Sequence, residues 1–105
     1  MLKNAIIISG NLVQDHEFIY PYYRLLEEEF KVDVCLLEGK PVQGILGTII
    51  PPNKNQIVKK IDEVSIDDYK LLILPGGVKA MEKVRQEKKI IKFISEFDKK
   101  KKIIA

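Results

Sequence analysis

The stretch that most constrains the fold of this 105-residue chain is Leu71–Gly77, which reads LLILPGG. Four consecutive apolar residues followed by a proline and two glycines predict a short strand that is buried on both faces and ends in a sharp turn. Strands of this kind occur in parallel sheets whose two faces are both covered by helices. The stretch therefore predicts an α/β protein.

Other apolar stretches supply the rest of the predicted sheet. Ala5–Ile8 and Lys31–Leu37 predict two strands that precede LLILPGG, and Ile103–Ala105 begins a fourth strand after it. The segment 38–55 is rich in glycine and proline and predicts loop and short strand, in the form of an edge hairpin. The sheet is thus predicted to have four principal strands.

Helices are predicted between these strands. Apolar residues recur at helical spacing from Phe18 to Phe30, so an amphipathic helix is expected after the first strand. Pro21 is tolerated there only if its ring lies in the first turn, which places Asp15–Glu17 at the helix start. Ala80–Glu87 and Lys89–Phe97 predict a short helix and a longer one after the glycine pair.

The order of these elements predicts the fold class. It is strand, helix, strand, irregular segment, strand, helix, strand, and right-handed crossovers then give a doubly wound parallel sheet of the flavodoxin-like kind. Sites in such sheets form at the carboxyl ends of the strands. Glu17 follows the first strand and the pair Gly76 and Gly77 follows the third, so we expect them to share that edge.

Composition narrows the classes of function. Lys and Arg number 18 against 15 Asp and Glu, and this weak positive balance gives no reason to expect nucleic acid as a partner. The single cysteine, Cys35, excludes an intrachain disulfide and fits a reducing cytoplasm. No apolar run approaches the roughly 20 residues needed to cross a bilayer. One histidine and one cysteine make no ligand cluster, so neither a metal nor another cofactor is predicted.

The glycine pair admits two interpretations. Gly76 and Gly77, placed directly after a strand, can turn their backbone N–H groups toward a ligand and hold an oxyanion. Without further information, Pro-Gly-Gly after a strand is more often a plain turn. The sequence lacks the glycine and lysine spacing of a phosphate-binding loop, so a phosphate site is not predicted.

The candidate side chains also have ordinary structural explanations. Glu17 is either a carboxylate that shares a proton with a reactive group or a helix-start acid favoured by the helix dipole. Glu82 lies either at the mouth of the same crevice or on a helix surface. His16 has no convincing nucleophile to pair with and is expected to be exposed, whereas Cys35 is expected to be a core residue.

A family resemblance favours the catalytic interpretation. It rests on DHEFIYPYYRLL at Asp15–Leu26, YKLLILPGG at Tyr69–Gly77, AMEKVR at Ala80–Arg85, and the terminal KKIIA. In this order the stretches resemble the DJ-1/PfpI family, and most closely its PfpI-type intracellular peptidase branch within the class I glutamine amidotransferase-like superfamily. The resemblance implies a three-layer sandwich that is incomplete at its carboxyl end.

The resemblance implies a role for each candidate residue. Glu17 matches the glutamate that hydrogen-bonds the nucleophilic cysteine, and Gly76 and Gly77 match the glycines whose amides form the oxyanion site. Glu82 matches the glutamate that reaches a neighbouring subunit's cysteine–histidine pair in PfpI-type oligomers, although the loop before it differs by one residue. The loop 44–48 reads GILGT where many members carry His-Gly-Tyr.

The resemblance also implies that the nucleophile lies outside this chain. In the family, the strand that matches Lys102–Ala105 is followed at once by a Cys-His-Gly elbow, which this sequence does not contain. We therefore interpret residues 1–105 as the amino-terminal part of a single domain that ends just before the elbow. The remaining part is expected as a second polypeptide, and the family tendency predicts a homo-oligomer, either a dimer or a hexamer.

Two hypotheses of function follow. In the first, the chain contributes to a cytoplasmic cysteine hydrolase of the peptidase or glyoxalase/deglycase type once a carboxy-terminal part supplies cysteine and histidine. In the second, it is a non-enzymatic binding, chaperone-like or stress-related module that has lost its nucleophile. A companion polypeptide beginning with Cys-His would support the first hypothesis.

Overall fold

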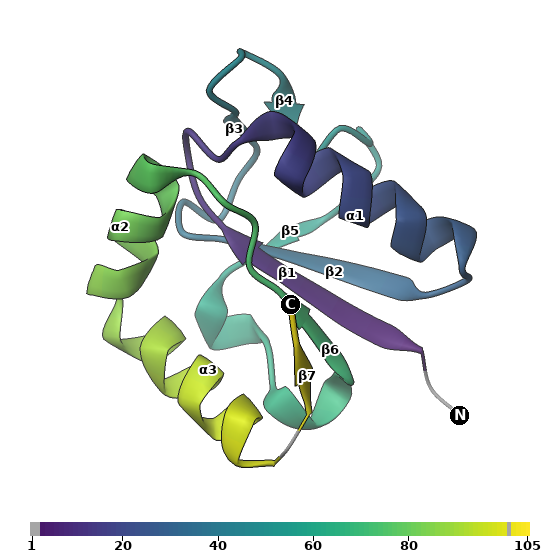
Figure 1. Ribbon diagram of the computed structural model, residues 1–105, viewed down its shortest axis with the longest axis vertical. Helices are drawn as coiled ribbons and strands as arrows, with labels where there is room; N and C mark the ends of the chain where they lie inside the picture. Colours follow the sequence, from purple (N-terminus) through teal and green to yellow (C-terminus); the bar gives the residue numbers. More distant parts are fainter. Residues whose placement is uncertain (1–2, 101) are drawn as a thin grey trace.

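A five-stranded parallel sheet forms the centre of the protein (Figure 1). The computed structural model describes residues 3–100 and 102–105. The strand order is β5-β2-β1-β6-β7, and every neighbouring pair is parallel. The strands are β1 (Asn4–Ser9), β2 (Lys31–Leu36), β5 (Val58–Lys59), β6 (Leu71–Ile73) and β7 (Ile103–Ile104). The predicted α/β fold is confirmed.

Helices lie on both sides of the sheet. The helix α1 (Asp15–Glu27) covers one face, whereas α2 (Val78–Gln86) and α3 (Lys88–Lys99) lie toward the other, as Figure 1 shows. Two short 3-10 helices, η1 (Ile61–Glu63) and η2 (Ile66–Asp68), connect β5 to β6. The placement of helices on both faces is the predicted one.

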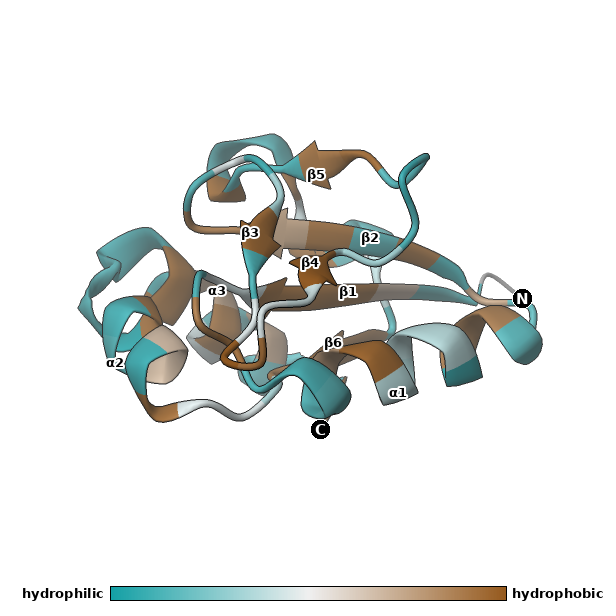
Figure 2. Cartoon of the chain, turned by 90° about the horizontal axis from the view of Figure 1, so that it is seen from above, coloured by the Kyte–Doolittle hydropathy of each residue, from teal (hydrophilic) through white to brown (hydrophobic). Residues whose placement is uncertain are grey.

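The core has two layers, one on each face of the sheet, and successive side chains of β1 alternate between them. Ile7 packs with Phe18 and Tyr22 of α1, whereas Ile6 and Ile8 pack in the layer that contains the buried residues of α3. Because successive side chains of a strand point to opposite faces, one continuous apolar run serves both layers. Figure 2 shows the same concentration of apolar residues in the central strands.

A small hairpin stands apart from the main sheet. It consists of β3 (Val42–Gln43) and β4 (Ile49–Ile50), which pair antiparallel as a separate two-stranded sheet. The hairpin expected in segment 38–55 is therefore present, but it does not join the edge of the main sheet. The edge position is taken by β5 instead, a strand that the sequence pattern did not predict.

The position of Pro21 differs from the expectation. The helix α1 begins at Asp15 after the cap residue Gln14, so the proline lies inside the helix and beyond its first turn. Proline has no N–H, and the residue four positions earlier is Glu17. The carbonyl of Glu17 therefore lacks the donor that a regular helix would supply.

Candidate functional site

The candidate site lies beside β1, at the point where the chain stops adding strands on one side of β1 and starts adding them on the other. From β1 the chain passes to β2 on one side, whereas β6 lies on the other side of β1. Ligands of doubly wound sheets bind at such a switch point, beyond the carboxyl ends of the strands. Residues 13–17 follow β1 and residues 75–77 follow β6, so both segments reach this edge.

Glu17 and Gly76 meet at this edge. The amide of Gly76 donates a hydrogen bond to Oε1 of Glu17 at 3.1 Å. A Cβ atom at Gly76 would overlap the Glu17 carboxylate, so the approach requires a glycine. Glu17 is otherwise exposed, which leaves the carboxylate open to solvent. The structure thus brings together two residues that are 59 positions apart in the sequence.

Position 77 requires a glycine because of its backbone conformation and its close neighbours. Its φ of +128° lies in a region that L side chains rarely adopt, and it precedes the first residue of α2. A Cβ there would lie 2.8 Å from the backbone nitrogen of Gln14 and 3.1 Å from Cα of Val13. The second glycine therefore lets the turn after β6 pack closely against the segment that leads into α1.

The start of α1 is held by backbone and side-chain hydrogen bonds. The Gln14 side chain accepts from the amides of His16 at 2.8 Å and Glu17 at 3.3 Å, which satisfies two free donors of the first turn. The Gln14 amide donates to the carbonyl of Gly76 at 3.0 Å. His16 itself is exposed, as expected, and takes part here only through its backbone.

Glu82 lies one turn along α2 from the glycine pair. It is exposed and lines a shallow hollow together with Gly77, Met81 and Arg85. The structure therefore places Glu82 near the second glycine but gives it no hydrogen bond to Glu17 or Gly76 among the described contacts. A role for its carboxylate depends on a group brought from outside this chain.

Asp15 is a residue of the site region that the sequence analysis did not single out. It is only 1% exposed, and its carboxylate accepts from the amide of Leu46 at 2.8 Å and from that of Thr48 at 3.0 Å. Burial alone would raise the pKa of this carboxyl. Hydrogen bonds from Leu46 and Thr48 outweigh burial and hold the pKa below its ordinary value of 3.8.

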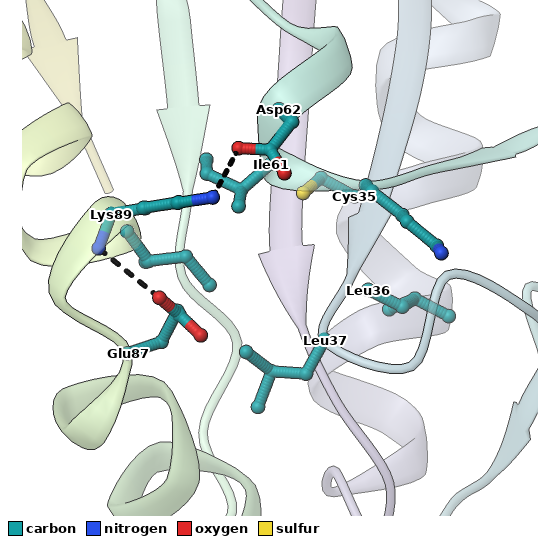
Figure 3. Close-up of a pocket in the computed structure, with 9 residues that line it drawn as sticks. Cys35, Leu36, Leu37, Ile61, Asp62, Glu87 and Lys89 are labelled. Atoms are coloured by element: carbon teal, nitrogen blue, oxygen red, sulfur yellow. Dashed lines mark hydrogen bonds and ion pairs between the residues drawn. The ribbon is translucent and has the colours of Figure 1, made fainter.

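Cys35 is a core residue, as the sequence predicted. It is fully buried, and burial together with the nearby Glu63 charge raises the pKa of its thiol to about 12. Figure 3 shows it at the wall of a pocket that is also lined by Asp62 and Lys89, whose charged groups lie 2.9 Å apart. A thiol with so high a pKa is a poor nucleophile near neutral pH.

The described part of the chain offers neither a cluster of metal ligands nor a membrane-spanning helix. Within residues 3–100 and 102–105, no three His, Cys, Asp or Glu side chains gather in a way that could hold a metal ion. None of the helices in that part of the chain is long and apolar enough to cross a membrane.

Comparison with known proteins identifies the family. The family model described as "DJ-1/PfpI family" matches residues 3–105. The chain belongs to the DJ-1/PfpI family. The match covers nearly the whole chain and agrees with the doubly wound parallel sheet.

Several members of the DJ-1/PfpI family with curated names are similar to this chain. A protein of Pyrococcus furiosus named deglycase PfpI is 35% identical over 86 residues, which cover 82% of this chain and 48% of the relative. A deglycase of Pyrococcus abyssi is 33% identical over 87 residues, covering 83% of this chain and 49% of the relative. The chain therefore spans about half the length of these curated relatives.

Solved structures of the DJ-1/PfpI family show the same fold. Drosophila melanogaster DJ-1beta superposes with a TM-score of 0.86 at 22% identity, covering 100% of this chain and 54% of the other. A two-domain protein of Anabaena variabilis with DJ-1/ThiJ/PfpI-like and ferritin-like domains superposes with a TM-score of 0.85 at 25% identity, covering 98% and 28%.

Proposed function

We propose that this chain supplies the carboxylate and the oxyanion donors of a cysteine-dependent hydrolase site, of the deglycase or peptidase type. The nucleophilic thiol would come from polypeptide outside these 105 residues. The observation that carries the proposal is the contact between Glu17 and the Gly76 amide at the switch point of the sheet. The names of the Pyrococcus relatives support deglycation as the reaction class.

Each group has a defined part in the proposed reaction. Glu17 takes up the thiol proton and so favours the thiolate, which bonds to the carbonyl carbon of the substrate while the C=O π electrons move onto the oxygen. When this adduct collapses, the proton returns from Glu17 to the leaving group. When the thiol replaces the Gly76 amide as the hydrogen-bond donor to the Glu17 carboxylate, that amide becomes free. It can then donate to the oxyanion, beside the Gly77 amide. Cys35 takes no part because it is buried and its thiol pKa is raised to about 12.

The proposal includes a partner and a location. The thiol is expected on a second polypeptide that corresponds to the half of the relatives that this chain does not match. Assembly into a dimer or hexamer would give the exposed Glu82 a neighbouring subunit to reach. A single buried cysteine is consistent with a cytoplasmic site of action.

A chimera tests the proposed function. Residues 1–105 are joined to the carboxy-terminal half of the Pyrococcus furiosus relative, and activity is measured on a glycated peptide and on a fluorogenic peptide. We expect thiol-dependent turnover of at least one substrate and a loss of roughly 100-fold in kcat for Glu17→Gln, because proton sharing by a positioned carboxylate contributes on that scale.

The control is Glu27→Gln, which changes an exposed glutamate of the same helix and should leave turnover unchanged. Equal activity of Glu17→Gln and the parent chimera would rule out the proposed role of Glu17. A folded chimera that binds either peptide without turning it over would favour the non-enzymatic alternative. Intact-mass analysis of the natural protein adds a second check, since a companion beginning with Cys-His is expected.

A further inference from the structure

We propose that Asp15 is a positioning residue, which clamps the first turn of α1 to the loop 44–48 and thereby holds Glu17 against the Gly76 amide. Its structural part stands on the hydrogen bonds of this chain. Its catalytic consequence rests on the proposed function. Asp15 keeps the site in shape and makes no contact with the substrate.

The first side of the clamp joins the start of α1 to the loop between β3 and β4. The amides of Leu46 and Thr48 donate to the two carboxylate oxygens of Asp15, at 2.8 and 3.0 Å. The amide of Ile45 donates to the carbonyl of Val13 at 2.9 Å. Figure 2 shows the apolar tip of this loop beside the beginning of α1.

The second side joins the same segment to the turn after β6. Here Gln14 donates its amide to the Gly76 carbonyl at 3.0 Å, and Gly76 donates its amide to Glu17 at 3.1 Å. The segment 13–17 is therefore bonded to a different loop on each side. If segment 13–17 moved toward one of these loops, its hydrogen bonds to the other loop would break.

Helix geometry couples the two sides. Successive residues of an α-helix are turned by about 100°, so Asp15 and Glu17 project about 200° apart. Any rotation of the first turn about the helix axis moves both carboxylates together. A fixed Asp15 consequently fixes the direction of Glu17, although Glu17 itself is exposed and Asp15 is buried.

The helix's own hydrogen bonds hold this turn less firmly than usual. Pro21 lies inside α1, so the Glu17 carbonyl receives no hydrogen bond from the position four residues later. A turn with an incomplete ladder depends more on contacts from outside the helix. The Asp15 clamp supplies such contacts at the position that the catalytic proposal requires.

Gly44 makes the close approach possible. It is buried, and a Cβ atom there would overlap the Asp15 carboxylate. Gly44→Ala therefore disturbs the clamp from the loop side without changing any charge. This gives two independent variants, Asp15→Asn and Gly44→Ala, that should have the same effect on Glu17. Asp98→Asn, which changes an exposed aspartate of α3, serves as the matched control.

The first test is amide hydrogen exchange on the 105-residue chain. Both clamp variants should accelerate exchange of the Gly76 amide by about tenfold or more, while the amides of β1 keep their protection. Faster exchange confined to Leu46 and Thr48, with Gly76 unchanged, would show that Asp15 only orders the loop and would overturn the proposal. Loss of protection throughout β1 in both variants would overturn it as well, because Asp15 would then be a general stability residue.

The second test uses the active chimera. If Asp15 acts through Glu17, both variants should lower kcat by about tenfold with little change in KM, because the substrate contacts remain. Unchanged kcat would contradict the proposal. If the parent chimera turns over neither peptide, the proposed function fails, whereas the exchange result still decides whether Asp15 positions Glu17.

Discussion

At the scale of single residues, Asp15 and Glu17 have opposite environments although they lie two positions apart. Asp15 is buried among backbone donors, and those donors lower its carboxyl pKa. Glu17 is exposed and has one described donor, the Gly76 amide. The buried carboxylate is thus suited to hold structure and the exposed one to meet a reacting group.

The lowered pKa of Asp15 predicts how stability changes with pH. A carboxyl whose pKa is lower in the folded state contributes stability that is fully present above its unfolded value, here 3.8, and is lost as the pH falls through the folded value. Asp15→Asn should therefore lower the Tm at pH 7, and the difference from the parent should shrink below pH 4. Thermal unfolding followed by circular dichroism at several pH values checks this, and a constant difference down to pH 2 would contradict it.

Burial of Cys35 predicts slow chemistry at its thiol. With a pKa of about 12, roughly one thiol in ten thousand is ionised at pH 8, and the sulfur is fully buried. We expect native protein to react with a thiol reagent at least a hundredfold more slowly than protein unfolded in urea. Stoichiometric labelling of native protein within seconds would show that Cys35 is accessible and not a core residue.

At the scale of elements, local sequence patterns predicted those segments whose own residues determine their structure. The apolar runs of β1 and β6 predict strands because a buried parallel strand needs apolar side chains on both faces. The strand β5 was missed because Val58–Lys59 is only two residues long and is defined by its pairing with β2. The helix start at Asp15 was predicted correctly, but Pro21 was wrongly placed in the first turn, because the rule that confines proline to that turn does not hold for α1.

The candidate site was predictable in part for the same reason. Glu17, Gly76 and Gly77 follow strands, so the topology rule places them at one edge. Their contact, and the clamp around Asp15, depend on hydrogen bonds between residues that are far apart in the sequence, such as Asp15 with Leu46 and Gln14 with Gly76. Such bonds cannot be predicted from the spacing of residues within a short stretch of sequence.

The turn that starts α2 predicts the effect of one substitution. Gly77→Ala introduces a side chain at a φ of +128° and a Cβ 2.8 Å from the Gln14 nitrogen. We expect the free energy of unfolding to fall by about 2 kcal/mol, since strained backbone positions cost on that order. Urea unfolding measures this. Lys79→Ala, at an exposed position of the same helix turn, is the control and should change stability by less than about 0.5 kcal/mol.

At the scale of the whole molecule, the sheet is covered unevenly. Ile103 lies in β7, the strand at one edge of the sheet, and pairs with Leu71 in β6. Its apolar side chain remains 67% exposed. Parallel sheets normally have both faces covered and their edges protected. About half of each curated relative lies outside the part that this chain matches. We therefore expect the proposed partner polypeptide to cover β7.

If the partner covers β7, a substitution in that strand should weaken its binding. Ile103→Lys should weaken binding of the carboxy-terminal half of the Pyrococcus furiosus relative, supplied as a separate polypeptide, by at least tenfold, because a buried lysine would lose its hydration. Ile57→Lys is the matched control, since Ile57 is 73% exposed and precedes β5 at the opposite edge of the sheet. Calorimetric titration measures both. Equal affinities would place the partner elsewhere.

The crowding of Asp15 and Gly44 also limits how such chains can diverge. A side chain at position 44 would occupy the volume of the Asp15 carboxylate, so neither position can change alone without loss. Loss of the acid removes the reason for the glycine, and gain of a side chain at position 44 expels the acid. Across related sequences, the two positions should therefore vary as a pair, whereas Ile45 and Leu46, whose side chains are exposed, should vary independently of both.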